Sequence, residues 1–455
     1  MKKIATCRAC GSKALTPAFS ISLANERSPL GLRSKRGSLD YVFCDPSQDA
    51  FACGLLQKNT LSAAEYSEVI PSGRYRSTRN SLRKAATEAL ESISGRDCRA
   101  LDIGCNDGTL LSFYPRWVDR VGIDSDAVID EIGDWAQTVQ ARFPSEETRH
   151  ALAGDKFDLI TAISVLEELD DPKSFFESVK ELLVDDGVLV VETLYAPVAL
   201  TRNAIESLHP GISAAFSLAV IERIVRDADL KIFRGALTEK EGGSIRLFIT
   251  HAESEEYDFD PWYERLARLW DEENALAMRA LQPYQAFEQR LMEAREAFSK
   301  LLNEIADRGE RIHILGADIQ AQTLLAWAGA SATQTVSAAV GMGCARAGER
   351  LGSDGPPIIT ETDCRAAEPE YLIAPARMKR EMLERWRETI LIGGKLIFAT
   401  PSPVIVTSAN YAAEFGKALA LGDGPGGVET LRTILHAAGG LRLIADRGGR
   451  TVASG

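Results

Sequence analysis

The sequence lacks a long apolar run. None of its apolar segments reaches the ~20 consecutive residues that a membrane-spanning helix needs. Residues 1–7 carry two lysines, but no apolar stretch follows them, so the start of the chain does not have the pattern of a secretory signal. We therefore expect a cytoplasmic protein without a membrane partner.

The sequence also has fewer basic residues than acidic ones. The chain has 52 lysine and arginine residues against 65 aspartate and glutamate residues, which gives a formal net charge of −13. A nucleic-acid binder needs a basic surface that neutralises phosphates, so we do not expect DNA or RNA as a partner. The expectation is a small-molecule substrate and a monomer or homodimer.

Cysteine is scarce over most of the chain but crowded at its start. Four of the eight cysteines lie within the first 53 residues. In a reducing compartment such cysteines are free, buried or metal-bound more often than disulfide-bonded. The crowding predicts a small module over residues 1–60, held by Cys7, Cys10, Cys44 and Cys53.

The chain beyond this module alternates between short apolar runs and helical segments. This pattern is typical of a parallel sheet with helices on both faces. It predicts an α/β domain over residues 61–255. The expected strands lie at residues 100–103, 120–123, 157–163, 188–191 and 244–250, and the expected helices at 77–92 and 216–229.

A second α/β unit is predicted after a helical bridge. Residues 256–310 are rich in Ala, Leu, Glu and Arg, which indicates two long helices. Residues 311–455 then resume the strand pattern and end in a Gly- and Ala-rich tail, 401–455, in which the sequence pattern does not place individual elements. The expected strands of this unit lie at residues 311–315, 336–340, 371–374 and 395–399.

A glycine-containing loop, residues 102–108, follows the first strand of the larger domain. Its glycines allow a tight turn and a close approach of a ligand to the backbone. We expect a helix from Thr109, whose free N–H groups would bind a carboxylate. The loop therefore predicts a cofactor site formed by Asp102, Gly104, Cys105, Asn106 and Gly108.

The competing reading of this loop is a dinucleotide site. That motif would place glycine at positions 104, 106 and 109, but the sequence has Asn106 and Thr109. Asp124 ends the next strand, where a carboxylate accepts hydrogen bonds from ribose hydroxyls. Ala162 and Ser164 lie at the end of the third strand. The order of these elements along the chain, with the loop first, Asp124 second and this strand third, favours S-adenosylmethionine and a class I methyltransferase sheet. An α/β domain for another nucleotide is the alternative.

Four segments carry a closer resemblance, namely residues 7–11, 53–57, 102–108 and 242–246. Through them the chain resembles the three-domain bacterial sugar C-methyltransferases, over roughly residues 5–400. The resemblance implies a zinc-binding N-terminal domain, a class I methyltransferase domain and a C-terminal Rossmann-like domain that helps to hold a nucleotide sugar. The implied reaction is C-methylation of a nucleotide-linked keto-deoxysugar.

The implied zinc site departs from the family pattern. The family has a second Cys-x-x-Cys pair, but here Ala50 stands where the partner of Cys53 would be. Cys44 could replace that partner through a longer loop, so that four thiolates close a structural Zn²⁺ site. Four reduced cysteines without a metal are the alternative.

The residues of the acceptor reaction are also implied by the resemblance. Methylation beside a keto group needs a base for the α-proton. Tyr75 matches a family tyrosine, and Glu192 follows the strand at 188–191. His209 lies seven residues before Phe216, whereas the family places its histidine four or five residues before the matching phenylalanine. O- or N-methylation of another metabolite and a non-catalytic cofactor-binding homologue remain alternatives.

Overall fold

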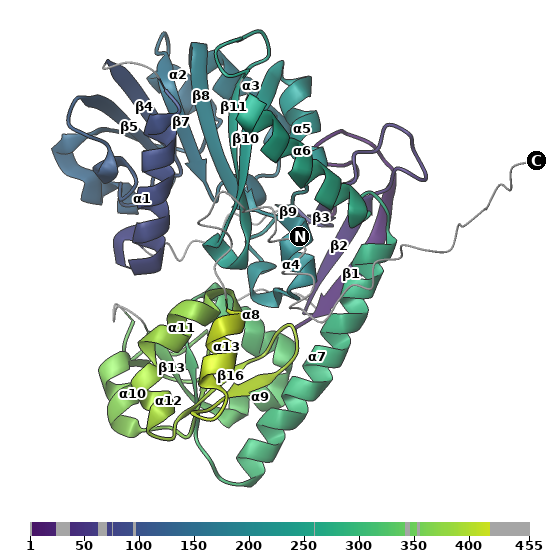
Figure 1. Ribbon diagram of the computed structural model, residues 1–455, viewed down its shortest axis with the longest axis vertical. Coiled ribbons are helices and arrows are strands. Elements are labelled where there is room, and N and C mark those ends of the chain that lie inside the picture. The colour runs from purple at the N-terminus through teal and green to yellow at the C-terminus, as the bar shows by residue number, and fades with distance from the viewer. Residues whose placement is uncertain are drawn as a thin grey trace, which may run out of the picture.

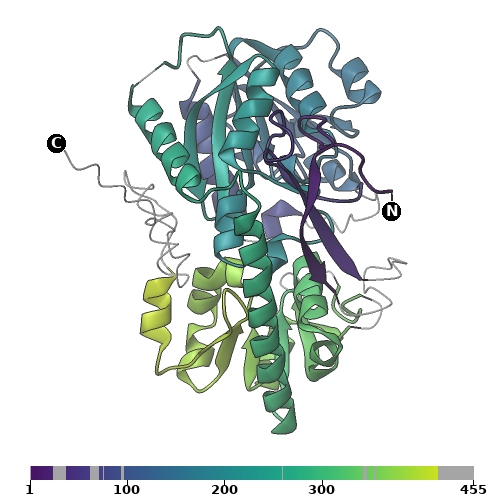
Figure 2. The ribbon, with the colours of Figure 1, turned by 90° about the vertical axis from the view of Figure 1, so that its right-hand side faces the viewer.

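The computed structural model describes residues 2–23, 37–61, 71–74, 76–93, 97–258, 260–341, 346–352 and 355–418. Tyr75, Cys344 and residues 419–455 of the tail lie outside the described residues. Two α/β units are stacked end to end, with a long helix and a narrow antiparallel sheet beside them (Figures 1 and 2). No helix in the described part of the chain has both the length and the apolar character that crossing a bilayer requires.

The N-terminal module is an antiparallel sheet completed by a strand from later in the chain. Its order is β1-β2-β3-β9. In β3–β9 the partners are Leu56 with Ala215 and Gln57 with Ala214. The module therefore extends past the predicted boundary at residue 60 and shares a strand with the larger domain. The strands are β1 (Leu15–Ser22), β2 (Ser38–Cys44), β3 (Leu56–Lys58) and β9 (Ala214–Ala215).

The central domain is a seven-stranded sheet in the order β6-β5-β4-β7-β8-β11-β10. The first five strands are parallel, and β11 is antiparallel to both of its neighbours. This arrangement confirms the predicted class I methyltransferase sheet. The strands are β4 (Cys98–Ile103), β5 (Val118–Asp124), β6 (Gln137–Gln140), β7 (Phe157–Ile163), β8 (Leu183–Leu194), β10 (Leu230–Thr238) and β11 (Ser244–His251).

Helices cover both faces of this sheet, and their apolar residues recur at helical spacing. In α1 (Arg76–Glu91), Leu82, Ala85, Ala86 and Ala89 are buried on one side. The others are α2 (Glu146–Ala151), α3 (Pro172–Leu182), α5 (Leu218–Asp227) and α6 (Asp260–Ala275). A further helix, α4 (Ala196–Thr201), follows β8 and contacts α7 (Gln282–Asp307).

The helix predicted from Thr109 does not form. Only a 3-10 turn, η2 (Leu111–Phe113), follows the cofactor loop. Pro115 explains the early end, because it disfavours helical backbone at Tyr114 and has no N–H for a helical bond. The prediction that a helix N-terminus binds the cofactor carboxylate is therefore wrong for this chain.

The predicted bridge contains two helices, as expected, but only the second connects the parts of the molecule. α6 packs on β10 of the central sheet. α7 (Gln282–Asp307) starts with Pro283 in its first turn and contacts β1, α4, α8 and α9. Its buried side chains recur every three to four residues: Tyr284, Phe287, Leu291, Ala294, Phe298, Leu302 and Ile305.

The C-terminal unit is a six-stranded sheet in the Rossmann order, β14-β13-β12-β15-β16-β17, antiparallel only at β17. The expected second Rossmann-like domain is therefore present. Its elements are β12 (Ile312–Leu315), α8 (Ile319–Ala328), α9 (Ala330–Thr335), β13 (Val336–Gly341), β14 (Ile358–Thr360), α10 (Glu361–Ala367), β15 (Tyr371–Ile373), α11 (Lys379–Arg385), α12 (Arg387–Leu391), β16 (Lys395–Phe398), β17 (Val404–Val406) and α13 (Tyr411–Lys417).

The two α/β units meet through the carboxyl edges of their sheets. The 3-10 turn η6 (Lys240–Gly242) follows β10, and η7 (Ala376–Met378) follows β15. These turns contact each other, and a Cβ added to Gly242 would lie 2.9 Å from the Cβ of Arg377. The Arg377 backbone N–H also donates to Glu206 Oε1 at 3.0 Å. Ligand sites of open α/β sheets lie at these edges, so the two edges face a shared region.

Candidate active site

The cofactor loop turns sharply at the end of β4. The N–H groups of Gly104 and Cys105 donate to Ile123 O at 2.8 and 3.0 Å. Gly104 has φ +72°, and a Cβ there would lie 2.6 Å from Val165 Cγ2. Gly108 has φ +74°, and its Cβ would lie 2.7 Å from Ile132 Cγ1. Both positions therefore require glycine for conformation and for space.

Asp124 ends β5 beside this loop. Its Oδ2 accepts the Asn106 N–H at 2.9 Å, and its Oδ1 accepts the Asp126 N–H at 2.9 Å. A carboxylate has about four acceptor positions, so each oxygen keeps capacity for one more donor. The arrangement fits the paired hydroxyls of a ribose, the role predicted for Asp124.

The polar side chains of the loop organise the chain around it. Asn106 has φ +52°, and its Oδ1 accepts the N–H groups of Ser72 and Asp107, each at 2.8 Å. Asp107 accepts the N–H of Gly73 at 2.8 Å. These contacts tie the loop to the segment just before Tyr75. Asn106 therefore has a structural role in addition to the backbone contact that we expected.

Asp102 and Cys105 support the loop from below. Asp102 is buried, and its Oδ1 accepts the Thr161 hydroxyl at 2.6 Å. Burial raises the pKa of Asp102 to about 7. Cys105 is also buried and lies so close to Gly122 that a Cβ there would be 2.8 Å from its Sγ. Since neither side chain reaches the surface, these two residues fit a cofactor through backbone groups.

The end of β7 forms the next wall of the site. Ala162 is fully buried, whereas Ser164 is partly exposed with φ +60°. The Ser164 N–H donates to Glu192 O at 2.8 Å, and its hydroxyl accepts the Lys240 ammonium at 2.6 Å. Ser164 thus joins the cofactor strand to the loop that faces the C-terminal unit.

Glu192 lies in a buried ion pair. Its Oε2 accepts Arg246 Nη2 at 2.5 Å and Nε at 2.7 Å, and its Oε1 accepts the Thr238 hydroxyl at 2.7 Å. Burial alone would raise its pKa, but Arg246 and Lys240 outweigh this effect and lower it. A carboxylate that is held ionised and fully hydrogen-bonded is a poor proton acceptor. This geometry favours a structural role over the catalytic role predicted for Glu192.

His209 lies in the loop between η5 (Ile205–Ser207) and β9. Its Nδ1 accepts the Gly211 N–H at 3.2 Å, which commits the lone pair of that nitrogen. The same loop packs on the turn η4 (Leu166–Glu168), because the Ser213 N–H donates to Glu167 O at 2.8 Å. The structure therefore brings His209 into the neighbourhood of the cofactor strand without aligning it as a base.

Glu168 is a site residue that the sequence analysis missed. The residue is exposed to solvent, and its pKa is raised by the loss of hydration beside the protein and by the neighbouring carboxylates of Glu167 and Asp124. The only sequence signal is that Glu168 belongs to an acidic pair with Glu167 and comes four residues after Ser164, the serine that follows β7.

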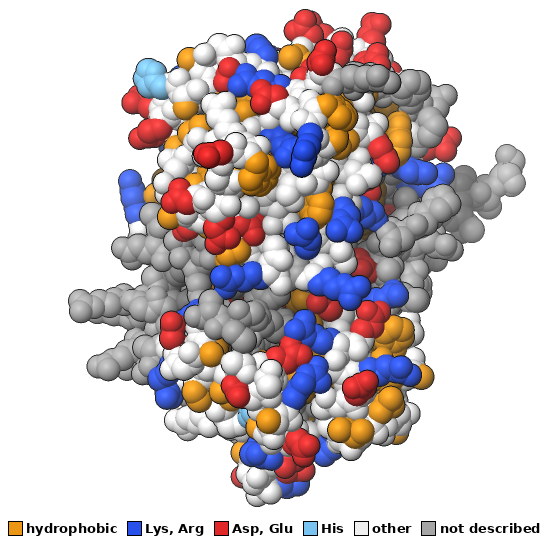
Figure 3. Space-filling view, turned by 90° about the vertical axis from the view of Figure 1, so that its left-hand side faces the viewer, with side chains coloured by type: hydrophobic (Ala, Val, Ile, Leu, Met, Phe, Trp, Pro, Cys, Tyr) orange, Lys and Arg blue, Asp and Glu red, His pale blue; other side chains and the backbone are white. Residues whose placement is uncertain are grey.

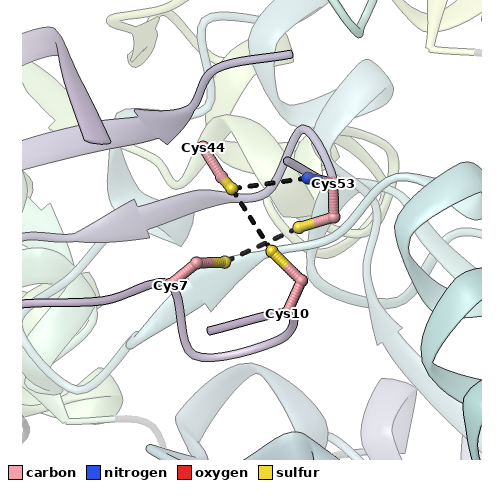
Figure 4. Close-up of side chains that lie close together, drawn as sticks. All are labelled: Cys7, Cys10, Cys44 and Cys53. Carbon is pink, nitrogen blue, oxygen red and sulfur yellow. Dashed lines mark hydrogen bonds between the residues drawn. The ribbon is translucent and has the colours of Figure 1, made fainter. Parts of the chain in front are cut away.

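The four predicted metal ligands come together in the N-terminal module (Figure 4). Their sulfur atoms all lie within 4.8 Å of one another, with 3.6 Å between Cys7 and Cys53 and 3.5 Å between Cys10 and Cys44. Tetrahedral zinc with Zn–S bonds near 2.3 Å would place its sulfurs ~3.8 Å apart. Hydrogen bonds from Cys44 and Cys53 lower the pKa of Cys10. The cluster is compatible with a closed zinc site in which Cys44 supplies one of the four thiolates.

Two protein-family models match adjoining parts of the chain. The model described as a methyltransferase domain covers residues 73–234, and the model described as a C-methyltransferase C-terminal domain covers residues 239–401. The boundary between them falls at the end of β10, immediately before the turn that contacts the C-terminal unit.

Curated relatives match part of the chain. The ubiquinone biosynthesis O-methyltransferase of Actinobacillus pleuropneumoniae serotype 5b is 34% identical over 108 residues, 21% of this chain and 45% of the relative. The enzyme of the same name from Psychrobacter cryohalolentis is 26% identical over 137 residues, 28% of this chain and 51% of the relative. The chain thus spans about half the length of the curated relatives it matches.

A solved structure similar to the chain also covers part of it. A S-adenosylmethionine-dependent methyltransferase from Clostridium acetobutylicum is 13% identical, with a TM-score of 0.31 over 40% of this chain and 92% of that one. The fold and the two family matches together show that the chain carries a class I methyltransferase domain, followed by a region that matches the C-methyltransferase C-terminal domain.

Proposed function

We propose that the enzyme transfers a methyl group from S-adenosylmethionine to a carbon beside the keto group of a nucleotide-linked deoxysugar. The observation that carries the proposal is the pairing of two sheets through their carboxyl edges. One edge holds the Asp124 loop, and the other belongs to a sheet in the order of nucleotide-binding domains. The match of residues 239–401 to a C-methyltransferase C-terminal domain supports carbon as the acceptor atom.

The cofactor side follows from the geometry of the loop. S-adenosylmethionine supplies a methyl group on a positively charged sulfur. Asp124 would bind the ribose, and the backbone of residues 104–108 would lie along the cofactor. Ala162 and Ser164 would border it from β7. Residues 102 and 105 would act through the backbone, because their side chains are buried under the loop.

Cationic side chains near the facing edges support an anionic acceptor. The Arg202 guanidinium donates to Gly242 O, and burial lowers the pKa of Arg202 to about 10. Arg377 Nη2 lies 3.5 Å from Asp318 Oδ2 at the start of α8. Lys and Arg side chains also gather where the two units meet (Figure 3). In a chain of net charge −13, this concentration suits the diphosphate of a nucleotide sugar.

The reaction needs a base for the proton α to the carbonyl. We propose Glu168, because it lies on the turn η4 that follows β7 at the carboxyl edge of the sheet, and because its raised pKa favours uptake of a proton. His209 is the alternative, although its Nδ1 already accepts the Gly211 N–H. The predicted family tyrosine, Tyr75, stays a proposal as a second acceptor-side residue.

The experiment combines methyl transfer with proton exchange. The enzyme is incubated with S-adenosylmethionine and a panel of dTDP-, GDP- and CDP-linked keto-sugars. In parallel, the sugars are incubated in D₂O with enzyme and S-adenosylhomocysteine, so that deuterium enters the α-carbon without methylation. We expect Glu168→Gln to abolish both reactions and His209→Asn to retain exchange, with the exposed Glu177→Gln as a control. Methyl transfer to none of the sugars by cofactor-bound enzyme would contradict the proposal.

O-methylation of a small metabolite is the second candidate, and the names of the curated relatives favour it. It requires no α-proton base, so it predicts that no deuterium enters a substrate carbon. A non-catalytic role would be indicated if calorimetry detected no binding of S-adenosylhomocysteine.

We also propose that the four-cysteine cluster holds a structural Zn²⁺, as its sulfur spacing supports. Metal analysis of the purified protein should give about one zinc per chain, since one closed site takes one ion. Cys10→Ser should lose it.

A further inference from the structure

Arg8 occupies the short turn between the first two cysteines, and it is buried. Its Nη1 donates to Lys58 O at 2.7 Å and its Nη2 to Thr60 O at 2.6 Å. Its Nε and Nη2 also contact Asp170 Oδ1 at 3.0 and 2.9 Å. This guanidinium therefore spans from the cysteine cluster to the central domain.

Asp170 belongs to the segment that carries the proposed base. It comes two residues after Glu168, at the end of the turn that follows β7. The Ser213 hydroxyl lies 3.1 Å from Glu168 O and 3.3 Å from Asp170 Oδ1. The Ser213 N–H donates to Glu167 O. Any displacement of Asp170 would therefore move the Glu168 turn and the His209 loop together.

Lys58 holds the same loop from β3. Its ammonium donates to Pro210 O at 2.6 Å, and its backbone N–H donates to Ser213 O at 2.9 Å. β3 then pairs with β9, immediately after this loop. The N-terminal module thus contacts residues 209–215 directly, through its backbone and through Lys58. It also contacts them indirectly, because Arg8 binds Asp170 and Asp170 lies beside Ser213.

We propose that Arg8 is a positioning residue that couples the cysteine cluster to the two segments bearing the candidate bases, residues 164–170 and 209–215. Cys7 and Cys10 lie on either side of Arg8 in the same turn. Metal bound by these cysteines would therefore fix the backbone of Arg8 and, with it, the position of the guanidinium group. Arg8 then orders the acceptor side of the site without touching the cofactor loop. This inference rests on the proposed function only for the measurement of turnover, because the other measurements need no substrate.

The test uses Arg8→Met in the full-length protein, because methionine keeps the apolar bulk and removes the five donors. We expect unchanged zinc content and unchanged affinity for S-adenosylhomocysteine by calorimetry. Amide hydrogen exchange should increase ~10-fold or more in residues 164–170 and 209–215, but not in residues 102–108. The kcat should fall ~10- to 100-fold, the usual effect of a small misplacement of catalytic groups.

Three comparisons sharpen the result. Lys13→Met, an exposed cation of the same module, should behave as wild type. Asp170→Asn should reproduce the exchange changes, and the double variant with Arg8→Met should add little to either single variant. Arg8→Lys should restore only part of the protection, because an ammonium cannot make the forked contacts.

The outcome does not depend on finding the acceptor, since hydrogen exchange needs no turnover. If Arg8→Met does not fold, wild-type protein with and without a zinc chelator gives the same comparison. Increased exchange in the two segments on chelation, with the cofactor loop unchanged, supports the coupling. An Arg8→Met protein with bound zinc and wild-type exchange in both segments would overturn it, as would a chelated wild type with unchanged exchange there.

Discussion

At the scale of single residues, the two carboxyl groups beside the cofactor loop have different surroundings. Asp124 is oriented by two backbone N–H groups and is partly exposed. Asp102 is buried beneath the loop and accepts the Thr161 hydroxyl. The two carboxyl groups therefore differ in function, and each leads to a separate prediction.

Asp124→Asn should weaken cofactor binding. Hydrogen bonds to a charged group contribute ~1.5–3 kcal/mol, so the Kd for S-adenosylhomocysteine should rise ~10- to 100-fold. Isothermal titration calorimetry measures this directly. Asp130→Asn, an exposed acid on the following 3-10 turn, is the control and should bind as wild type. Equal affinity in both variants would remove Asp124 from the ribose site.

Asp102 should make the folded protein less stable as pH rises. Its pKa is raised from 3.8 to about 7 by burial, so between pH 4 and 7 the folded chain keeps a proton that the unfolded chain has lost. The unfolding free energy contributed by this group therefore falls across that window. Urea unfolding at pH 5 and pH 7.5 should show a smaller loss of stability for Asp102→Asn than for wild type. An identical loss in both would contradict the raised pKa.

At the scale of elements, ion pairs connect the end of β8 to β11 and α1. Arg246 in β11 contacts Glu192 in β8 and Glu88 in α1, at 2.5 and 2.7 Å. Both Arg246 and Glu192 are almost completely buried. Because Glu192 O also accepts the Ser164 N–H, this cluster supports the wall of the cofactor site.

Arg246→Met should be strongly destabilising. It would leave the Glu192 carboxylate buried without its cation, at a cost of ~3–5 kcal/mol. Chemical denaturation followed by circular dichroism gives the free energy of unfolding. Lys173→Met, which breaks an exposed pair with Glu177 on α3, should change that free energy by less than ~0.5 kcal/mol. Similar effects of the two substitutions would show that the buried cluster adds little.

Elements with a strong local pattern could be predicted from the sequence, and elements decided by distant partners could not. The helix expected at 77–92 is observed at Arg76–Glu91, and the strand expected at 157–163 is observed with those bounds. In contrast, β9 has two alanines and exists only because β3 lies beside it. The helix expected from Thr109 does not form, because Pro115 disfavours helical backbone at Tyr114 and this effect outweighs the apolar residues.

The site could be predicted in part for the same reason. The predicted cofactor residues lie at the ends of successive strands, so their spacing along the chain was enough to predict that they form one site. Glu168 depends on its surroundings for its pKa, and the sequence gives no measure of them. The four cysteines were predicted as a set, although only the fold shows that the Cys44 loop brings its sulfur within 3.5 Å of Cys10.

At the scale of the whole molecule, the N-terminal module is integrated into the central domain rather than appended to it. β9 completes its sheet, and α7 contacts β1 as well as the C-terminal helices α8 and α9. Metal in the cysteine cluster should therefore stabilise more than the module that holds it.

Removal of zinc should lower the Tm of the whole chain. Without metal, the cysteine turns would lose their cross-link, and the β3–β9 pairing and the Arg8 contacts would weaken with them. Differential scanning calorimetry with and without a chelator should show a lower main transition that added Zn²⁺ restores. A main transition that does not shift, in protein shown to have lost its metal, would mean that the module is energetically independent.

The proposed function is methyl transfer to carbon at the region where the two carboxyl edges face each other. Its most direct test uses S-adenosylmethionine labelled with ¹³C in the methyl group, wild-type enzyme and the nucleotide-linked keto-sugar that supports turnover, with the product examined by NMR. The account predicts that the labelled methyl carbon is bonded to the carbon next to the carbonyl. A labelled methyl bonded to oxygen or nitrogen would contradict it.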